Sequence, residues 1–247
     1  MIDLHCHILP GVDDGARTLE EAVGMCRMAV ADGCAAMIAT PHQRRGEWWN
    51  DDRASLEALA WKLQAAVGDE LHVGLGGEIH VDPQLLDEVE RLPDAGILPL
   101  AGSRYLLIEF DPFTTPAQAS SLVHEMSVAG WRPIVAHPEL IPWLARNPEM
   151  LGDLVALGAT AQVTAMSLTG DFGRRPQEDA LAFLAAGLVH YVASDAHGTR
   201  RRPPGLSRAY QMIAARWGDE TARRLTTDNP QAVLDDRPLP AAVEGAA

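Results

Sequence analysis

The chain opens with Met-Ile-Asp-Leu-His-Cys-His at residues 1–7, and its last predicted strand runs into Val-Ala-Ser-Asp-Ala-His at residues 192–197. In both stretches an apolar run ends in two potential metal ligands spaced i, i+2, which puts both side chains on one face of an extended chain. A closed barrel brings its first and last strands side by side. The two stretches therefore predict a barrel with a metal site where they meet. The four ligands are His5, His7, Asp195 and His197.

The composition is that of one folded domain. The chain has 247 residues, of which 47% are hydrophobic and 22% charged, a length that single α/β barrels commonly reach. We expect a single barrel domain over residues 1–237 and a flexible tail over 238–247. The sequence has no run of about 18 apolar residues, and Met1 leads directly into a predicted strand. We therefore expect a cytoplasmic protein without a signal peptide or a membrane segment.

The chain is strongly acidic, with a formal net charge of −14. A broad surface for nucleic acid is therefore not expected, and an anionic substrate must be captured locally. Lys62 is the only lysine and lies in a predicted helix, whereas Schiff-base and carbamylated-lysine mechanisms need a lysine at a strand end. The three cysteines form no Cys-x-x-Cys pair, so neither a disulfide framework nor a zinc knuckle is predicted.

Strand-like apolar runs alternate with helical patterns, which is typical of parallel βα units and of the α/β fold class. Residues 18–21 have the pattern of a capping box, and Gly33 and Gly130 follow helical segments as stop signals. Seven strands are predicted, near residues 1–5, 35–40, 71–77, 104–109, 132–136, 159–164 and 189–194. Helices are predicted near 18–32, 53–67, 116–129, 147–157, 176–186 and 204–217.

The carboxyl ends of the predicted strands carry the polar residues that point to chemistry. Barrel enzymes place their active sites at this end, and six of the seven strands here end in His, Asp or Glu. A single strand-end histidine is often structural, but six strands of seven indicate a shared site. The sixth strand, which ends near Gln162 and Thr164, lacks such a residue. The further strand-end candidates are His42, Glu78, Glu109 and His137.

The loop after the first strand, Gly-Val-Asp-Asp-Gly at residues 11–15, supplies another carboxylate. Asp-Gly is a common turn pair, but this loop lies beside the histidine pair, so one aspartate can join the metal site. His72 and His190 stand at strand starts, the opposite end, and are expected to be structural. His80 shares a face with Glu78 and is a candidate to support the ligands from behind.

The motifs resemble, in their order, the polymerase and histidinol phosphatase (PHP) superfamily. Within it they are most similar to the bacterial tyrosine-protein phosphatases associated with capsular and exopolysaccharide synthesis. The resemblance runs from Met1 to about Leu234, and its specificity lies in the ordered set. The motifs are Met-Ile-Asp-Leu-His-Cys-His-Ile-Leu-Pro-Gly-Val-Asp-Asp-Gly (1–15), Ala-Thr-Pro-His (39–42), Gly-Gly-Glu-Ile (76–79), Leu-Ile-Glu-Phe (107–110), Val-Ala-His (135–137) and Ala-Ser-Asp-Ala-His (193–197).

This resemblance implies a distorted seven-stranded (β/α) barrel that holds up to three metal ions in a cleft. It assigns the first ion to His5, His7, Glu78 and Asp195. It assigns the second to Glu78, as a bridge, with Glu109 and His137, and the third to Asp14, His42 and His197. Mixed imidazole and carboxylate ligands suit manganese, iron or zinc, and the sequence does not choose among them.

The mechanism we expect is metal-assisted hydrolysis of a phosphomonoester by a metal-bound water, without a phosphoenzyme. Asp14, His42 and Arg202 are the residues expected to act in catalysis. Cys6 is not expected to be a nucleophile, because strand alternation points it away from the two histidines that flank it. The sequence also lacks the glycine-rich phosphate loop of the cysteine phosphatases.

Phosphate capture calls for arginine, whose planar fork matches phosphate oxygens. The resemblance implies two active-site arginines. Arg202 matches one, but Leu140 stands where the family has the other, three residues after His137. Arg44 and Arg45, in the loop after His42, are candidates to compensate. Trp48, in the same loop, is a candidate to stack on a phosphotyrosine ring.

The leading prediction is a metal-dependent tyrosine phosphatase, whose partner by resemblance is the tyrosine-rich tail of a bacterial polysaccharide-assembly kinase. Three alternatives stay open. One is a PHP phosphoesterase on histidinol phosphate, another small phosphomonoester or a phosphodiester, which Leu140 favours. The second, an amidohydrolase, is disfavoured because no strand ends in lysine. The third is a catalytically weak metal-binding module that regulates a kinase or polymerase, but crowded carboxylates without a metal argue against it.

Overall fold

The computed structural model describes residues 1–88, 92 and 96–239. The strands are paired in parallel throughout, as expected for repeated βα units. In the described residues they are β1 (Ile2–Cys6), β2 (Ala36–Ala39), β3 (His42–Gln43), β4 (His72–Leu75), β5 (Glu78–His80), β6 (Tyr105–Glu109), β7 (Arg132–Ala136), β8 (Thr160–Thr164) and β9 (Tyr191–Ala193).

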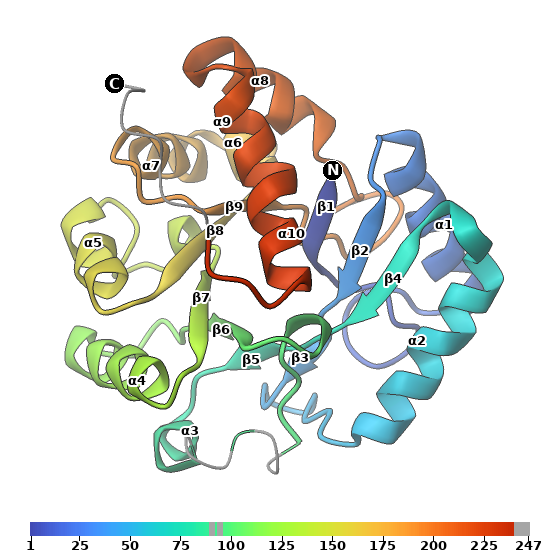
Figure 1. The fold of residues 1–247 in the computed structure, drawn as a ribbon, viewed down its shortest axis with the longest axis horizontal. Helices are drawn as coiled ribbons and strands as arrows, with labels where there is room; N and C mark the ends of the chain where they lie inside the picture. The colour runs from blue at the N-terminus through green and yellow to red at the C-terminus, as the bar shows by residue number, and fades with distance from the viewer. Residues whose placement is uncertain (89–91, 93–95, 240–247) are drawn as a thin grey trace.

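The strands form a ring. One sheet has the order β1-β2-β4 and the other β3-β5-β6-β7-β8-β9. The two sheets continue one another, because β2 pairs with β4 and β3 pairs with β5 at the same offset of 36 residues. A bridge between Cys6 and Ala196 joins β1 to the chain that follows β9. The predicted α/β barrel is therefore confirmed (Figure 1). The strand count of seven stays a prediction, because nine segments are assigned in the described residues.

The predicted strand over 71–77 is interrupted, which is a correction to the sequence analysis. One strand stops at Leu75 and the next begins at Glu78, because the chain turns at Gly76 and Gly77, where neighbouring side chains lie close to the backbone. A Cβ on Gly77 would lie 2.2 Å from Oε1 of Gln43, so only glycine fits there. Gln43 in turn accepts a hydrogen bond from the backbone N–H of Leu98 at 2.9 Å, which holds this turn in place.

Helices surround the strands in Figure 1, with α1 and α2 beside β1, β2 and β4 and with α4, α5 and α7 outside β6 to β9. Thr18 accepts a hydrogen bond from the Glu21 N–H, as its capping pattern predicts. The short helices were not predicted, because a few residues carry no readable period. The helices are α1 (Leu19–Ala31), α2 (Arg53–Val67), α3 (Pro83–Glu88), α4 (Pro116–Val128), α5 (Pro148–Ala156), α6 (Ala165–Thr169), α7 (Arg174–Ala185), α8 (Ser207–Trp217), α9 (Asp219–Arg223) and α10 (Asn229–Leu234).

Two clusters of buried side chains make up the core. The larger lies between the strands and the helices, and the smaller fills the barrel with residues such as Ile38, Leu107 and Ile134. Val233 of α10 joins this inner cluster and closes the amino-terminal end of the barrel. Of the predicted flexible tail, Leu239 packs against the inner cluster, and residues 240–247 lie outside the described part. A membrane-spanning helix is not found among the described helices, none of which combines the needed length and hydropathy.

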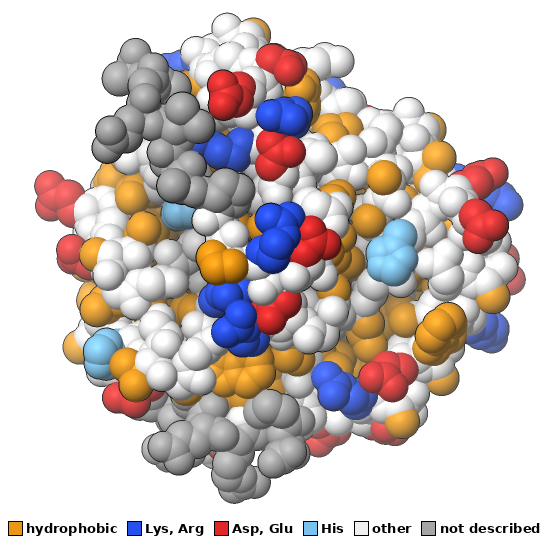
Figure 2. All heavy atoms as spheres, in the orientation of Figure 1, with side chains coloured by type: hydrophobic (Ala, Val, Ile, Leu, Met, Phe, Trp, Pro, Cys, Tyr) orange, Lys and Arg blue, Asp and Glu red, His pale blue; other side chains and the backbone are white. Residues whose placement is uncertain are grey.

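The face drawn in Figure 2 is the one covered by α10, and acidic and basic side chains are interspersed on its described part. The residues just after α10 form ion pairs. Arg104 and Arg132 both contact Asp236, at 3.0 and 3.2 Å, and Arg237 contacts Asp235 at 2.8 Å.

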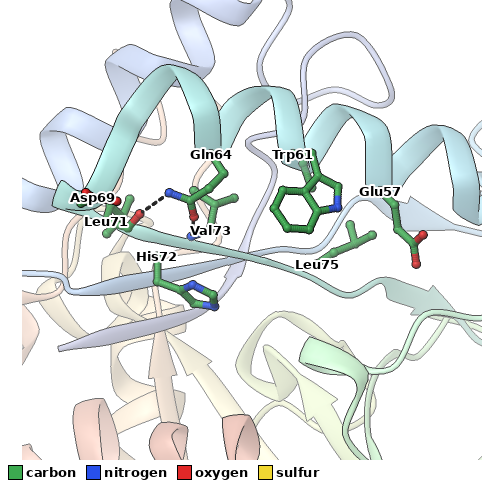
Figure 3. Close-up of a pocket in the computed structure, with 9 residues that line it drawn as sticks. Glu57, Trp61, Gln64, Asp69, Leu71, His72, Val73 and Leu75 are labelled. Carbon is green, nitrogen blue, oxygen red and sulfur yellow. Dashed lines mark hydrogen bonds between the residues drawn. The ribbon is translucent and has the colours of Figure 1, made fainter.

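The outer edge of β4 is capped by a side chain. β4 lies at the end of the three-stranded sheet, and Gln64 of α2 reaches down to it (Figure 3). Its amide oxygen accepts the Val73 N–H at 2.7 Å, and its amide nitrogen donates to the Leu71 carbonyl at 3.0 Å. The side chain thereby satisfies the two backbone groups that a neighbouring strand would bind. Beside it Trp61, 75% exposed, overhangs a groove of about 560 Å³.

Candidate metal centre

The strand ends bring all nine predicted ligands together at the carboxyl end of the barrel. Their ligand atoms form four overlapping groups, and within each group the atoms lie within 4.8 Å of one another. That these residues bind metal remains a prediction. The groups are His7, Asp14, His42 and His197; His5, His137 and Asp195; His5, His7 and Glu78; and His42, Glu78 and Glu109.

The predicted division into three sets stays a prediction, and these groups match it only in part. The third set, Asp14, His42 and His197, lies within one group, which His7 joins. In the second set, Nε2 of His137 lies 2.8 Å from Oε1 of Glu78 and 3.9 Å from Oε1 of Glu109. Glu78 thus touches members of every set, which is the position that a bridging carboxylate requires.

Local backbone irregularities aim several of these side chains at the centre. The pairing of β1 with β2 shifts between Asp3 and Cys6, and such a bulge changes which face successive side chains occupy. Leu4 packs inside the barrel, yet His5 also reaches the centre. His137 and Asp195, each just after a strand, have left-handed φ angles of 32° and 52°. Non-glycine residues rarely adopt this conformation, and it is concentrated at functional sites.

His5 and His7 are each held by an oxygen on the ring nitrogen that faces away from the centre. Nδ1 of His5 lies 2.8 Å from Oε1 of Gln162, and Nδ1 of His7 lies 2.7 Å from Oδ2 of Asp13. Burial opposes ionisation of Asp13, but the contact with His7 lowers the pKa of this carboxyl. An ionised carboxylate only accepts hydrogen bonds, so Nδ1 of His7 carries a proton.

Nε2 of His7 lies 3.3 Å from Nε2 of His5. Burial disfavours the charged ring, but Asp13, Asp195 and Glu78 raise the pKa of His7 well above its usual value, so a proton occupies Nε2 when no cation is bound. Two ring nitrogens in this arrangement repel unless a cation or a proton lies between them. In metal sites an imidazole commonly binds the ion through one nitrogen and donates its other N–H to a carboxylate or an amide oxygen. The Asp13 and Gln162 contacts match that pattern, so this donor set fits a metal ion.

Two buried atoms of the cluster have no hydrogen-bond partner in the described part of the chain, Oε2 of Glu78 and Nδ1 of His137. Ring nitrogens of His42 and His7 approach this Glu78 oxygen to 2.7 and 3.4 Å without the alignment of a hydrogen bond. A buried carboxylate oxygen left in this way is unfavourable unless a cation satisfies it. These unpaired atoms are therefore a further reason why the cluster fits metal ions.

The charges within the cluster compensate one another. Burial opposes ionisation of Glu78, but the charge of His5 and the contacts with His137 and His42 hold the pKa of this carboxyl well below its usual range. Burial also disfavours the charged form of His137, yet Glu78 raises the pKa of its ring to about 10. Protons on such rings offset the carboxylates, and a bound cation replaces them, so ion binding is expected to release protons.

The cluster forms the floor of a cleft of about 520 Å³. Asp14, whose side chain is 46% exposed, lies on the open side and contacts Nε2 of both His42 and His197 at 3.3 Å. Two arginines line the cleft. Nη1 of Arg45 lies 3.2 Å from Oε1 of Glu109, and Arg202 binds Asp195 and lies over the Phe172 ring. The opposite wall is apolar and is formed by Phe110, Pro112, Leu140, Ile141 and Pro142.

The structure corrects the expectation that Arg44 binds substrate. Its guanidinium is buried and donates to both carboxylate oxygens of Asp82, at 2.9 and 3.0 Å, and to Glu88 at 2.8 Å. Three such bonds to two carboxylates leave it no free edge for a phosphate. Trp48 stacks on the His42 ring, with centroids 5.4 Å apart, and so covers a ligand. Its contact with a substrate ring stays a prediction.

The structure adds two residues that the sequence analysis did not assign, Asp13 and Gln162, which orient His7 and His5. Signals for both were present in the sequence. Asp13 adjoins the predicted ligand Asp14, and Gln162 is the polar end of the strand that lacked a ligand. Cys6 behaves as predicted, since its thiol is buried and donates to the Ile38 carbonyl at 3.2 Å. His80 lies 3.4 Å from Oε2 of Glu109, in the supporting position expected for it.

Comparison with known proteins finds similarity over nearly the whole chain. The family described as capsular polysaccharide synthesis, CpsB/CapC, matches residues 1–235. The tyrosine-protein phosphatase YwqE of Bacillus subtilis is 36% identical, over 97% of this chain and 93% of its own. The tyrosine-protein phosphatase CpsB of Streptococcus pneumoniae is 31% identical, over 96% of this chain and 99% of its own.

The fold has a solved counterpart. A chain from the crystal structures of YwqE and CpsB, described as unique metal-dependent tyrosine phosphatases, superimposes with a TM-score of 0.89 at 33% identity, over 97% of this chain and 96% of that one. The dihydropyrimidinase of Brevibacillus agri matches with a TM-score of 0.56 at 13% identity, over 100% of this chain and 73% of its own. At that identity the second likeness concerns the barrel fold alone.

Proposed function

Because the chain belongs to the CpsB/CapC family of capsular polysaccharide synthesis, we propose that it is a metal-dependent phosphatase that hydrolyses phosphotyrosine in a protein substrate. The family resemblance predicted from the motifs is thereby confirmed. The observation that carries the proposal is the ring of nine ligand residues that opens into a cleft with two arginines. Relatives named as tyrosine-protein phosphatases over nearly the full chain support it.

The cleft suits an aryl phosphate. Arg45 and Arg202 lie at its rim with side chains 41% and 31% exposed, so both can turn toward a phosphate. A guanidinium binds phosphate oxygens in a bidentate manner, which orients the group as well as neutralising it. The apolar wall that includes Leu140 and Pro142 would pack against the tyrosine ring. Leu140, where the family has an arginine, thus contributes contact with the ring, and Arg45 takes over the second phosphate contact.

The residues proposed to hold the ions are the nine strand-end and loop ligands, in the three sets predicted from the sequence. Divalent ions bound there would supply Lewis acidity for hydrolysis of a phosphate ester. Asp13 and Gln162 keep the Nε2 lone pairs of His7 and His5 directed at the centre. Asp14 and His42 complete the open side where the phosphate enters, and Arg202 holds its oxygens. Manganese, iron and zinc all suit this donor set.

The partner we propose is a tyrosine kinase of bacterial polysaccharide assembly, dephosphorylated on its tyrosine-rich tail. Support for this substrate class comes from the family and from the relatives named above. We also propose that the protein acts in the cytoplasm. Its three cysteines are free and buried, as is usual for proteins of a reducing compartment.

The test is phosphate release by the purified, manganese-loaded protein from a tyrosine-phosphorylated peptide. A phosphoserine peptide and histidinol phosphate serve as competing substrates, and chelated protein and the His42→Ala variant serve as blanks. We expect release from the phosphotyrosine peptide that both blanks abolish. Faster turnover of histidinol phosphate would favour the small-substrate alternative. Folded, metal-loaded protein that releases no phosphate from any of the three would contradict the proposal and leave the regulatory module.

A further inference from the structure

A second hollow adjoins the proposed catalytic cleft. It has a volume of about 340 Å³ and shares two wall residues with the cleft, His80 and Asp111, so the two cavities lie side by side. Val81, Phe113 and Leu122 supply its apolar lining. Phe113 is 90% exposed, the most exposed of the large hydrophobic side chains in the described residues. The exposed ring lies beside the proposed binding cleft and is therefore available to contact a bound polypeptide.

The loop that carries Phe113 is well ordered by its own hydrogen bonds. The side chain of Asp111 accepts the Phe113 N–H at 2.7 Å, and its carbonyl accepts the Thr114 N–H at 3.0 Å and Nε1 of Trp143 at 3.3 Å. Thr115 and Gln118 then form a capping box at the start of α4. The loop backbone is therefore held in place, and a partner that packs on Phe113 has to order little more than the side chain itself.

We propose that this hollow is a subsite for an uncharged aromatic side chain of the polypeptide substrate, within two residues of the phosphotyrosine. The inference rests on the proposed function and extends it to the sequence around the scissile group. The occupant is aromatic because Phe113, Val81 and Leu122 offer a flat apolar surface. It is uncharged because the Asp111 carboxylate, 35% exposed at the shared wall, disfavours an acidic or phosphorylated side chain.

The spacing follows from the shared wall. Consecutive Cα atoms lie about 3.8 Å apart, and residues two positions apart in extended chain lie on one face about 7 Å apart. A side chain one or two residues from the phosphotyrosine can therefore cross from the cleft to the hollow. Burial of its ring against Phe113 is expected to strengthen peptide binding without changing the rate of the chemical step.

The test compares the wild type with Phe113→Ala and with Trp61→Ala, an equally conservative loss of an exposed ring in the remote groove of Figure 3. Substrates are p-nitrophenyl phosphate and phosphotyrosine peptides that carry Phe, Gly or Asp at each of the two positions on either side. For the wild type we expect a lower KM for Phe than for Gly at one position, and a higher KM for Asp. Phe113→Ala should lower the ratio of peptide to p-nitrophenyl phosphate kcat/KM roughly tenfold, through KM.

Each other outcome contradicts the inference in a distinct way. A wild type that treats Phe, Gly and Asp peptides alike at every position excludes the subsite. An equal loss toward peptides and p-nitrophenyl phosphate in Phe113→Ala would place the residue in the cleft itself. An equal effect of Trp61→Ala would reduce the result to a general loss of surface hydrophobicity. If the wild type hydrolyses neither substrate, the proposed function itself fails, and the subsite with it.

Discussion

Arg44 and Arg45 are neighbours in the chain but make different contacts. The Arg44 guanidinium is buried against Asp82 and Glu88, whereas that of Arg45 lines the cleft and approaches Glu109. β3 ends at Gln43 and Arg44 has a left-handed φ of 62°, so the chain bends here and sends one guanidinium to the protein and the other to the cleft. The sequence analysis could not separate the two, because both have the same charge and the same loop position.

We expect Arg45→Ala to lower kcat/KM for an aryl phosphate by about a hundredfold, the usual loss for one positioned donor. Arg44→Ala is the matched variant. It should lower stability by about 1–3 kcal/mol, because it removes the hydrogen bonds to two partly exposed carboxylates, and it should lower kcat/KM far less than Arg45→Ala does. Steady-state kinetics and urea unfolding of both variants check this pair. Equal losses of kcat/KM in the two variants would contradict the prediction that only Arg45 contacts the substrate.

At the scale of elements, the side chain of Gln64 substitutes for a strand along the edge of β4. It bonds the Leu71 carbonyl and the Val73 N–H, and its amide also donates to the Gly68 carbonyl at 2.7 Å. The periodicity of the sequence predicts an amphipathic helix at α2, but it does not indicate that Gln64 caps the edge of β4. Only the packing of α2 over β4 brings the amide to the unpaired strand edge.

Gln64→Leu is expected to lower the free energy of unfolding by about 1–3 kcal/mol, because it leaves partly buried backbone groups unpaired. Urea unfolding monitored by circular dichroism measures the change. Glu57→Leu, two helical turns away on the same face of α2, is the control, since the one ion pair it makes in the described residues is an exposed one with Arg53 at 3.7 Å. A change within about 0.5 kcal/mol for both variants would show that the edge needs no cap.

His190 joins the start of β9 to β8. Its backbone N–H donates to the Ala161 carbonyl at 2.9 Å, and its ring Nδ1 accepts the Ala161 N–H at 3.2 Å. Burial lowers the pKa of this ring from 6.5 to about 4. The unfolded chain therefore binds a proton at a higher pH than the folded one, and stability declines as pH falls from about 6.5 to about 4.

Linkage puts the loss at up to about 3 kcal/mol, at about 1.4 kcal/mol for each unit of pKa shift. The His190→Asn variant keeps an acceptor for the Ala161 N–H but does not titrate. Urea unfolding at pH 7.5 and pH 4.5 should therefore show a smaller acid loss for the variant than for the wild type. If the two proteins lose stability in parallel, His190 is not the group responsible.

At the scale of the whole molecule, the metal cluster ties distant parts of the chain to one centre. Its ligands run from His5 to His197, so ions bound there would cross-link most of the strands of the barrel. A ligand that binds only the folded state stabilises it by about 2.7 kcal/mol at a concentration a hundred times Kd. For a domain of this size that is a rise in Tm of roughly 5–10 °C.

Metal removal tests this at the same scale. We expect chelated protein to melt below manganese-loaded protein by that margin in differential scanning fluorimetry, with a smaller difference at acidic pH, where protons compete for the histidines. The Glu78→Gln variant replaces the shared carboxylate with an amide, so its Tm should rise less when the ion is added. Coincident melting curves of the wild type with and without metal would contradict the proposed metal centre.

The sequence alone determined the fold class, the family and the nine ligand candidates. It could do so because parallel βα order puts every strand's carboxyl end at one rim, and because ligand chemistry depends on residue type. Tertiary structure alone decided which arginine faces the cleft, that Gln162 and Asp13 orient His5 and His7, and that Phe113 borders a second hollow. These facts depend on side-chain contacts between residues up to 157 positions apart, which no local pattern in the chain encodes.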